Sequence, residues 1–363
     1  MASRTHAGSA YMEFAKLRSA AEYNLATSGI MSYPLAELPA KLEDLEINGP
    51  TLYGYAPLLE RLAARNGVST DCVTTAAGTS MANHLALAAT LEPGDEALVE
   101  HPTYELLVNT LQYLGAGVRY FERRMENSFR VDLEEIEREM TPKTRLIILT
   151  NLHNPTGAYL DEATLRAVGN LARNHKAYVL VDEVYLEAMY EQRPQPAIHL
   201  GEQFVVTSSL TKAFGLSGLR CGWILANPEL TRRMWHINDL YGVNAAFPAD
   251  LLSVIALDNL DRVSMRAKKL LEANRPALDA FLESRSDLEC FRPEFGTIVF
   301  PKLLRGSVEL LDRLLREKYQ TAIVPGSYFD MSRHFRIGIG GEPEMTRVAL
   351  ERLAAGLDEM KTL

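Results

Sequence analysis

Five polar side chains with the means to do chemistry lie in the middle of the chain. Lys212 carries an amine that can act as a nucleophile or a base once it loses its proton, and Asp182 carries a carboxylate. Tyr185 and Asn154 add a phenol and an amide, and Arg220 adds a planar guanidinium that suits phosphate and carboxylate groups. Each of them alone is typical of a loop or a solvated surface, so their meaning depends on whether the fold brings them together.

Short apolar runs precede most of these residues and predict buried β-strands. Helical patterns separate the runs, and Asp132 and Asp161 stand where N-caps are expected. The predicted strands cover residues 97–99, 145–150, 177–181, 204–207 and 223–226, and the predicted helices cover 80–91, 132–140 and 161–174. Continuous apolar strands that alternate with helices are typical of a mainly parallel sheet flanked by helices, so we predict an α/β fold.

The polar residues gather at one edge of this predicted sheet. Asn154, Asp182 and Lys212 each come shortly after a predicted strand, and the segment Gly78-Thr79-Ser80 opens a helix near the start of the sheet. In an open α/β sheet, ligands bind in the crevice at the carboxyl ends of the strands. In this order and combination, the residues favour a shared ligand site over unrelated turns, caps and surface charges.

The C-terminal third has a different pattern, with fewer strands. Helical patterns there alternate with two short apolar runs, at 296–300 and 335–339. We predict a large α/β domain at 47–270 and a smaller α+β domain made of 1–46 and 271–363. The N-terminal stretch is expected to pack on the smaller domain.

The composition argues against several classes of protein. Of the 363 residues, 47% are hydrophobic and 23% are charged, as in ordinary globular proteins. The formal net charge is −9, whereas a protein that binds nucleic acid usually shows a basic face. Three cysteines are too few to stabilise such a chain by disulfide bonds. Residues 1–6 carry no apolar run, and no apolar stretch is long enough for a membrane span. We therefore expect a soluble cytoplasmic protein without nucleic-acid or membrane partners.

Several motifs with known chemistry are absent from the sequence. No P-loop is found, and Pro343 stands where the cluster at 338–341 would need the last glycine of a dinucleotide-binding fingerprint. Neither an H-E-x-x-H pattern nor a paired C-x-x-C pattern is present. We expect no metal site.

With these motifs set aside, the remaining segments identify a family. The sequence resembles the class I/II pyridoxal-phosphate-dependent aminotransferases, which have the aspartate-aminotransferase-like fold, fold type I. The matching segments are Asn154-Pro155-Thr156-Gly157, Asp182 with Tyr185, Ser209-Leu210-Thr211-Lys212, Gly218-Leu219-Arg220-Cys221-Gly222-Trp223 and Phe335-Arg336-Ile337-Gly338. The resemblance covers about residues 20–360 and implies a large cofactor-binding domain with a smaller α+β domain beside it.

The resemblance implies a covalent role for Lys212. Family members hold pyridoxal 5'-phosphate as a Schiff base on a lysine, and Lys212 matches that position. A free lysine has a pKa of about 10.4, so a partly dry, cation-rich site must favour the neutral amine. After the substrate displaces it from this internal aldimine, the same amine is the expected base for the Cα proton.

Other matched residues are expected to hold the cofactor ring. Asp182 stabilises the protonated pyridine nitrogen that makes the ring an electron sink. Tyr185 and Asn154 donate to the phenolic oxygen, and Tyr104 stands at the family's stacking position.

The resemblance also implies residues for the cofactor phosphate. The helix start at Gly78-Thr79-Ser80 offers backbone N–H groups and its dipole. Ser209 adds a hydroxyl, and Arg220 adds a charged, bidentate donor. Tyr53 is the residue predicted to reach the phosphate of the neighbouring subunit, with Tyr55 as the alternative.

The substrate carboxylate has matched residues as well. Arg336 corresponds to the family's carboxylate-binding arginine, Asn154 is a second residue expected to bind the substrate, and Gly29 lies where the family brings backbone close to that carboxylate. Leu59 stands where the family commonly has an arginine. No second arginine for a side-chain carboxylate is placed by a motif, which weakens the case for aspartate as the substrate.

The motif set leads to an aminotransferase that moves an amino group between an amino acid and a 2-oxo acid by a ping-pong mechanism. The first alternative is a lyase of the same fold, for example a carbon–sulfur β-lyase, because the motifs report the cofactor and not the fate of the carbanion. A cofactor-holding regulator is disfavoured, since too few residues precede the large domain for an added DNA-binding region. The resemblance further implies a homodimer with shared active sites.

Overall fold

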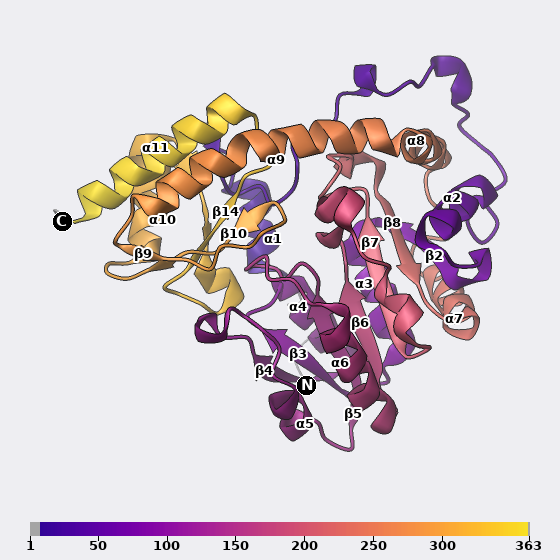
Figure 1. The fold of residues 1–363 in the computed structure, drawn as a ribbon. Helices are drawn as coiled ribbons and strands as arrows, with labels where there is room; N and C mark the ends of the chain where they lie inside the picture. The colour runs from indigo at the N-terminus through magenta and orange to yellow at the C-terminus, as the bar shows by residue number, and fades with distance from the viewer. Residues whose placement is uncertain (1–7, 362–363) are drawn as a thin grey trace.

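The computed structural model describes residues 8–361, and its central feature is a seven-stranded sheet (Figure 1). The strands are Val73–Ala77 (β2), Glu96–His101 (β3), Gly117–Glu122 (β4), Thr144–Thr150 (β5), Tyr178–Asp182 (β6), Phe204–Ser209 (β7) and Cys221–Leu225 (β8). Their order in the sheet is β2-β8-β7-β6-β5-β3-β4. The strands from β7 to β4 run parallel, whereas β8 is antiparallel to both β7 and β2. The predicted α/β fold with a mainly parallel sheet is confirmed.

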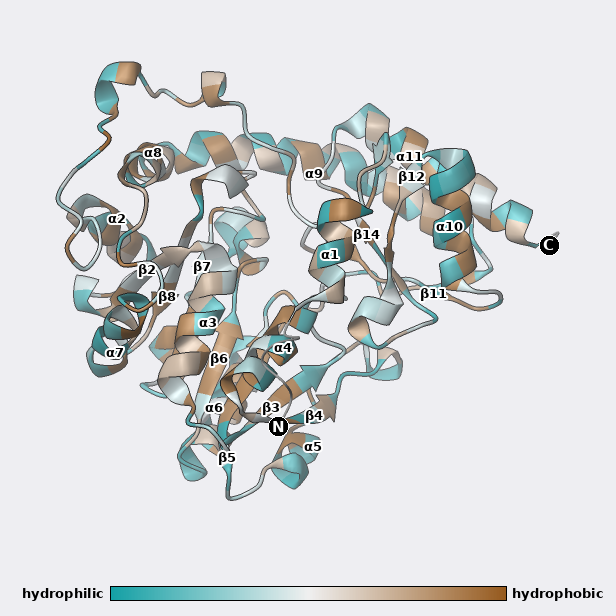
Figure 2. Ribbon diagram, turned by 180° about the vertical axis from the view of Figure 1, so that it is seen from behind, coloured by the Kyte–Doolittle hydropathy of each residue, from teal (hydrophilic) through white to brown (hydrophobic). Residues whose placement is uncertain are grey.

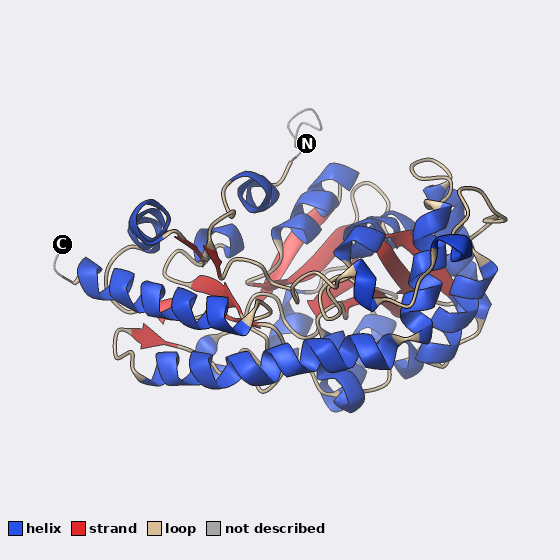
Figure 3. Cartoon of the chain, turned by 90° about the horizontal axis from the view of Figure 1, so that it is seen from above, coloured by secondary structure: helices blue, strands red, loops and turns tan. Residues whose placement is uncertain are grey.

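Helices cover both faces of this sheet (Figure 3). One face packs against Gly78–Thr90 (α3), Glu105–Leu114 (α4) and Pro228–Asn238 (α7), and the other packs against Ala56–Asn66 (α2), Leu133–Glu139 (α5), Glu162–Asn174 (α6) and Phe247–Asp258 (α8). Along β5, Leu146 and Ile148 point to the first group and Ile147 and Leu149 point to the second. Burial on both faces explains why the strands are apolar without alternation, as the colour of β3 and β6 in Figure 2 shows.

Two of the covering helices begin where the sequence predicts. The Asp132 carboxylate accepts hydrogen bonds from the backbone N–H groups of Glu134 and Glu135 at the start of α5. The Asp161 carboxylate accepts from the N–H of Thr164 at the start of α6. Both aspartates are N-caps, because each satisfies N–H groups that have no partner within the helix.

A second apolar cluster lies beside the sheet and is built mainly from the C-terminal third. Its helices are Leu260–Glu283 (α9), Val308–Tyr319 (α10) and Pro343–Met360 (α11). Its strands are Leu288–Glu289 (β9), Ile298–Val299 (β10), Lys302–Leu303 (β11), Thr321–Ala322 (β12), Val324–Pro325 (β13) and Phe335–Gly338 (β14). Strand β14 lies between β10 and β13, and both pair with it in antiparallel fashion. Helices α9, α10 and α11 contribute Leu271, Leu311 and Leu353 to the cluster.

The N-terminal stretch packs on this second cluster. Tyr23–Asn24 (β1) pairs in parallel with β12, and Leu25 is fully buried within the cluster. Helix Ala10–Leu17 (α1) packs next to it with the rings of Tyr328 and Phe329. The predicted domain limit at 270 falls inside α9, a continuous helix that runs past both clusters in Figure 1. The division into 47–270 and the remainder stays a prediction.

Short 3₁₀ helices complete the chain. They are Leu35–Glu37, Leu42–Asp44, Thr70–Cys72, Met125–Asn127, Leu186–Gln192, Ala197–Leu200, Ser217–Leu219 and Gly326–Phe329. No helix within residues 8–361 is both long enough and apolar enough to cross a membrane. Residues 1–6, whose lack of an apolar run contributes to the expectation of a cytoplasmic protein, lie outside the described residues.

Candidate active site

The carboxyl ends of β5, β6 and β7 open onto a cavity of about 230 Å³. Helix α3 begins at one side of this cavity, and helix α1 lies across it. Eight of the predicted site residues line it: Thr79, Ser80, Tyr104, Asn154, Asp182, Tyr185, Lys212 and Arg220. The fold therefore brings together side chains that lie far apart in the sequence.

Lys212 lies in the turn that follows β7 and reaches into the cavity. Its Nζ donates a hydrogen bond to Oγ of Ser28 at 3.0 Å and lies 6.0 Å from the centre of the Tyr185 ring. The carbonyl of Lys212 accepts from the N–H of Ile30 at 2.8 Å, which fixes the backbone of the lysine. No carboxylate within residues 8–361 forms an ion pair with the ammonium group, so the amine is free to react.

Asp182 ends β6 and is 5% exposed. Its carboxylate accepts from Nδ2 of Asn83 at 2.8 Å and from the N–H of Val184 at 3.1 Å. Burial raises the pKa of Asp182 to about 6, although these two hydrogen bonds and the charge of Lys212 act in the opposite direction. A buried carboxylate with neutral donors around it stabilises a positively charged group brought into the cavity.

A cationic cradle lies where α3 begins. Nη2 of Arg220 donates to the carbonyl of Ala77 at 2.9 Å, and no carboxylate of the described chain pairs with this guanidinium. A Cβ built on Gly78 would lie 2.3 Å from the same Nη2, so only glycine lets the arginine approach the helix start. The hydroxyl of Thr79 donates to Oγ of Ser209 at 2.8 Å. Helix N–H groups, two hydroxyls and an unpaired arginine together make an anion site.

Arg336 lies on β14, at the edge of the cavity, and is 1% exposed. Its Nη1 donates to Oδ1 of Asn154 at 2.9 Å, and its Nη2 donates to the Tyr11 hydroxyl at 2.7 Å. Its Nε has no hydrogen-bond partner, and no carboxylate of residues 8–361 neutralises it. A buried guanidinium in this state is suited to an external carboxylate, because a charge without a partner is costly to bury.

Two aromatic residues, Tyr104 and Tyr185, also line the cavity. Tyr104 precedes α4, and Tyr185 follows β6 and is 4% exposed. Burial raises the pKa of Tyr104, so its phenol stays neutral.

Two of the predicted residues lie away from this cavity. Gly29 packs against the backbone of Lys212, where an added Cβ would meet the Lys212 carbonyl oxygen at 3.1 Å. Tyr53 is 52% exposed, and its hydroxyl donates to Asp239 at 3.3 Å beside the ring of Trp235. Tyr55, the alternative, packs edge-on against Phe247.

The structure adds site residues that the sequence did not predict. Asn83 links two strands to α3, since it donates to Asp182 and accepts from the Thr207 hydroxyl at 2.6 Å. Its position one helical turn after Thr79 places it on the same face of α3, which is the signal that would have found it. Tyr11 and Met12 reach the cavity from α1, and no motif marked them.

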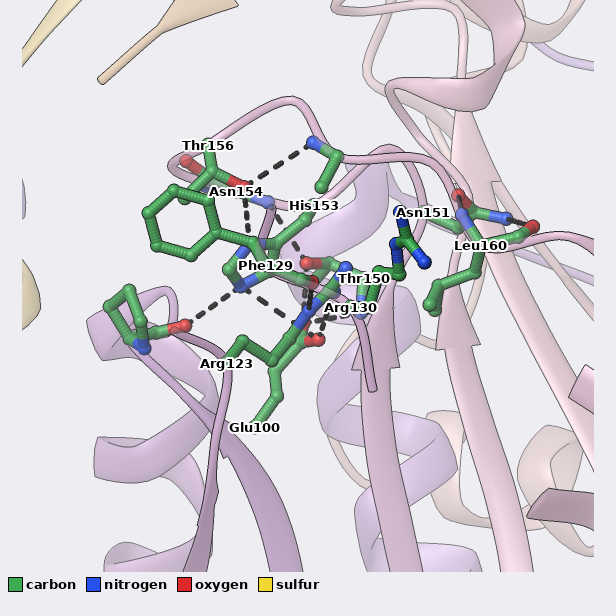
Figure 4. A network of polar contacts seen from close by, with 12 residues as sticks. Glu100, Arg123, Phe129, Arg130, Thr150, Asn151, His153, Asn154, Thr156 and Leu160 are labelled. Atoms are coloured by element: carbon green, nitrogen blue, oxygen red, sulfur yellow. Dashed lines mark hydrogen bonds and ion pairs between the residues drawn. The ribbon is translucent and has the colours of Figure 1, made fainter. Parts of the chain in front are cut away.

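A buried polar network supports Asn154 from behind (Figure 4). Glu100 on β3 accepts from the Thr150 hydroxyl and N–H, each at 2.6 Å, and forms an ion pair of 2.7 Å with Arg123. The Thr150 hydroxyl in turn accepts from the N–H of Asn154 at 3.0 Å. Glu100 and Arg123 are both fully buried, so the network fixes the loop that carries Asn154.

Comparison with known proteins shows the family of this chain. Residues 43–353 match the family model for aminotransferases of class I and II. The chain belongs to this family. Its members depend on pyridoxal phosphate, and the predicted resemblance and fold type I are both confirmed.

Relatives of known activity and structure are distant. Capreomycidine synthase of Streptomyces vinaceus is 29% identical over 93% of this chain and 90% of its own. Arginine–pyruvate transaminase of Pseudomonas aeruginosa is 28% identical over 82% of this chain and 78% of its own. A pyridoxal-phosphate-dependent aminotransferase from Streptococcus suis superposes with a TM-score of 0.88, at 28% identity over 94% of each chain.

The aminotransferase cofactor fits the chemistry of the described residues. Arg220 and the start of α3 are suited to its phosphate, and Asp182 is suited to its ring nitrogen. Lys212 is suited to its aldehyde, because the amine reaches the cavity and has no ion-pair partner among the described residues. The contact at Gly78 supports this fit directly, since any side chain there would displace the arginine.

We predict that Glu100→Ala destabilises the protein strongly. The change leaves the Arg123 guanidinium buried without its ion-pair partner, which costs about 3–5 kcal/mol in the free energy of unfolding. Urea unfolding monitored by circular dichroism measures this loss. As a matched control, Glu92→Ala breaks an exposed pair with Arg233 and should cost less than about 1 kcal/mol. Equal losses for the two variants would show that the buried network does not hold the loop.

We predict a pH-dependent stability difference between the cofactor-free wild type and Asp182→Asn. The pKa of Asp182 is about 6 when folded and near 3.8 when unfolded, so the folded state binds the extra proton between these values. The wild type therefore loses stability relative to the variant as pH rises from about 4 to about 6, by at most about 3 kcal/mol. Urea unfolding at a series of pH values measures the difference. A difference that stays constant across this range would contradict the burial argument.

Proposed function

We propose that this protein is a pyridoxal-phosphate-dependent aminotransferase that exchanges an amino group between an amino acid and a 2-oxo acid. The observation that carries the proposal is the set of cations around one cavity. Lys212 and Arg220 line the cavity, Arg336 bonds to the lining residues Asn154 and Tyr11, and none of the three cations has a carboxylate partner in residues 8–361. The buried carboxylate of Asp182 lines the same cavity. This arrangement suits a ligand pair that brings a phosphate, a carboxylate and a protonated ring nitrogen.

Each side chain has a defined task in this proposal. Bound pyridoxal phosphate supplies an electron sink for the carbanion formed at Cα of the substrate. Lys212 holds the cofactor covalently and then moves the Cα proton, while Asp182 keeps the ring nitrogen protonated. Asn154 and Tyr185 donate to the phenolic oxygen of the cofactor, and Tyr104 stacks on its ring.

The two anionic groups bind to different residues. The phosphate is held by Arg220 together with Gly78, Thr79, Ser80 and Ser209. Arg336 binds the substrate carboxylate with its planar fork. Among the described residues, the cations that line the cavity are Lys212 and Arg220. An additional acidic side chain on the substrate therefore has no dedicated partner there.

A homodimer is part of the proposal. Leu52, Tyr53, Leu240, Tyr241 and Val243 are large apolar side chains that are all more than half exposed. Exposed apolar residues near one another often mark a protein interface. Tyr53, or Tyr55 in its place, is the residue proposed to reach the phosphate of the neighbouring subunit. A cytoplasmic location stays an expectation from the sequence.

A lyase of the same fold is the second candidate, because not every relative in the family bears the name of a transaminase. Capreomycidine synthase, at 29% identity, is as similar to this chain as the arginine–pyruvate transaminase at 28%. The residues above hold the cofactor and remove a proton in either reaction, so they do not decide the fate of the carbanion.

We predict that a single half-reaction separates the two candidates. Holoenzyme mixed with a panel of amino acids, without any oxo acid, should release one equivalent of 2-oxo acid per active site and convert the cofactor to its pyridoxamine form. Loss of the visible cofactor absorption and enzymatic assay of the oxo acid measure these products. Continuous release of ammonia together with pyruvate would instead identify a lyase.

A further inference from the structure

A phenol that the sequence did not predict lies against the arginine of the site. Tyr11 on α1 is 7% exposed and lines the cavity together with Lys212 and Asn154. Its oxygen accepts a hydrogen bond of 2.7 Å from Nη2 of Arg336. Since the oxygen accepts from Arg336, the phenolic proton is available for an acceptor in the cavity.

Lys212 also influences the pKa of the Tyr11 phenol. Its Nζ donates to Oγ of Ser28, and the Ser28 hydroxyl is close enough to influence the ionisation of Tyr11. Burial raises the pKa of Tyr11, but the charges of Arg336 and Lys212 and the hydrogen bonds from Arg336 and Ser28 outweigh burial and lower it. A phenol in such a field is a strong donor toward an anion, because a charged acceptor strengthens the hydrogen bond.

Helix α1 fixes this phenol in place. Glu105, at the start of α4, accepts a hydrogen bond from the Tyr11 N–H at 2.9 Å and another from the Ser9 hydroxyl. The Tyr11 ring packs edge-on against Tyr104, with ring centres 5.7 Å apart, and in a tilted arrangement against Phe329, with ring centres 5.9 Å apart. The hydroxyl is therefore held at the arginine by a packed ring and by an anchored helix, and no solvent-exposed side chain has to move.

We propose that Tyr11 is a substrate-binding residue that donates a hydrogen bond to the α-carboxylate bound by Arg336. This inference rests on the proposed function, since the carboxylate is that of the amino-acid substrate. Asn154 and Tyr11 accept from the two terminal nitrogens of Arg336, so they flank the place where a carboxylate meets its remaining N–H groups. Tyr11 thereby favours ligands with a carboxylate over simple amines.

The test compares two amines that differ in the carboxylate. 2-Aminoisobutyrate and isopropylamine both condense with the cofactor of the holoenzyme, but 2-aminoisobutyrate has no Cα hydrogen and isopropylamine has no carboxylate. Titration of the visible cofactor absorption gives a dissociation constant for each. We expect Tyr11→Phe to weaken 2-aminoisobutyrate roughly 10- to 100-fold and to change isopropylamine less than about twofold.

Tyr328→Phe is the matched control. Its phenol also packs on α1, but its hydroxyl accepts from Arg18 at 3.0 Å and Tyr328 does not line the cavity, so both constants should stay unchanged. Unaltered 2-aminoisobutyrate binding in Tyr11→Phe, or equal weakening of both amines, would overturn the role of Tyr11. A wild-type absorption that responds to neither amine would instead refute the proposed function, and the inference with it.

Discussion

A buried positive charge without a protein counterion is the constraint on which the site depends. Arg336 is 1% exposed, and its partners among the described residues are the neutral oxygens of Asn154 and Tyr11. Burying an isolated charge is costly unless hydrogen bonds and an opposite charge compensate. The two neutral oxygens compensate in part, and in the proposed function the substrate carboxylate supplies the opposite charge. The Glu100 network behind Asn154 and the anchoring of α1 by Glu105 both hold these oxygens in position.

The distribution of charge across the cavity follows the same logic. Arg220 at the start of α3 and Arg336 on β14 mark two places for anionic groups, and Lys212 lies on the cavity wall as well. Asp182 is held by Asn83 and the backbone of Val184, and no arginine within residues 8–361 pairs with it, so its negative charge stays available to a ligand. A ligand with anionic groups and a protonated nitrogen is complementary to this pattern of charge. The cofactor of the family, pyridoxal phosphate, is of this kind.

The sequence predicted the parts of the fold and site that depend on local pattern. Buried parallel strands such as β5 and β6 are continuous apolar runs, and the aspartates before α5 and α6 are N-caps with a local cause. The antiparallel direction of β8 depends on which strands it joins, and no local pattern carries that information. Tyr11 and Asn83 were missed for a related reason, because each becomes a site residue only through contacts with distant segments.

In the proposed function, Lys212 binds the cofactor aldehyde covalently inside this cavity. Borohydride reduction of the purified holoenzyme, followed by digestion and mass spectrometry of the peptides, tests it most directly. We expect a single phosphopyridoxyl group, attached to the side chain of Lys212. A label on another lysine, or no label on a protein that retains the bound cofactor, would contradict it.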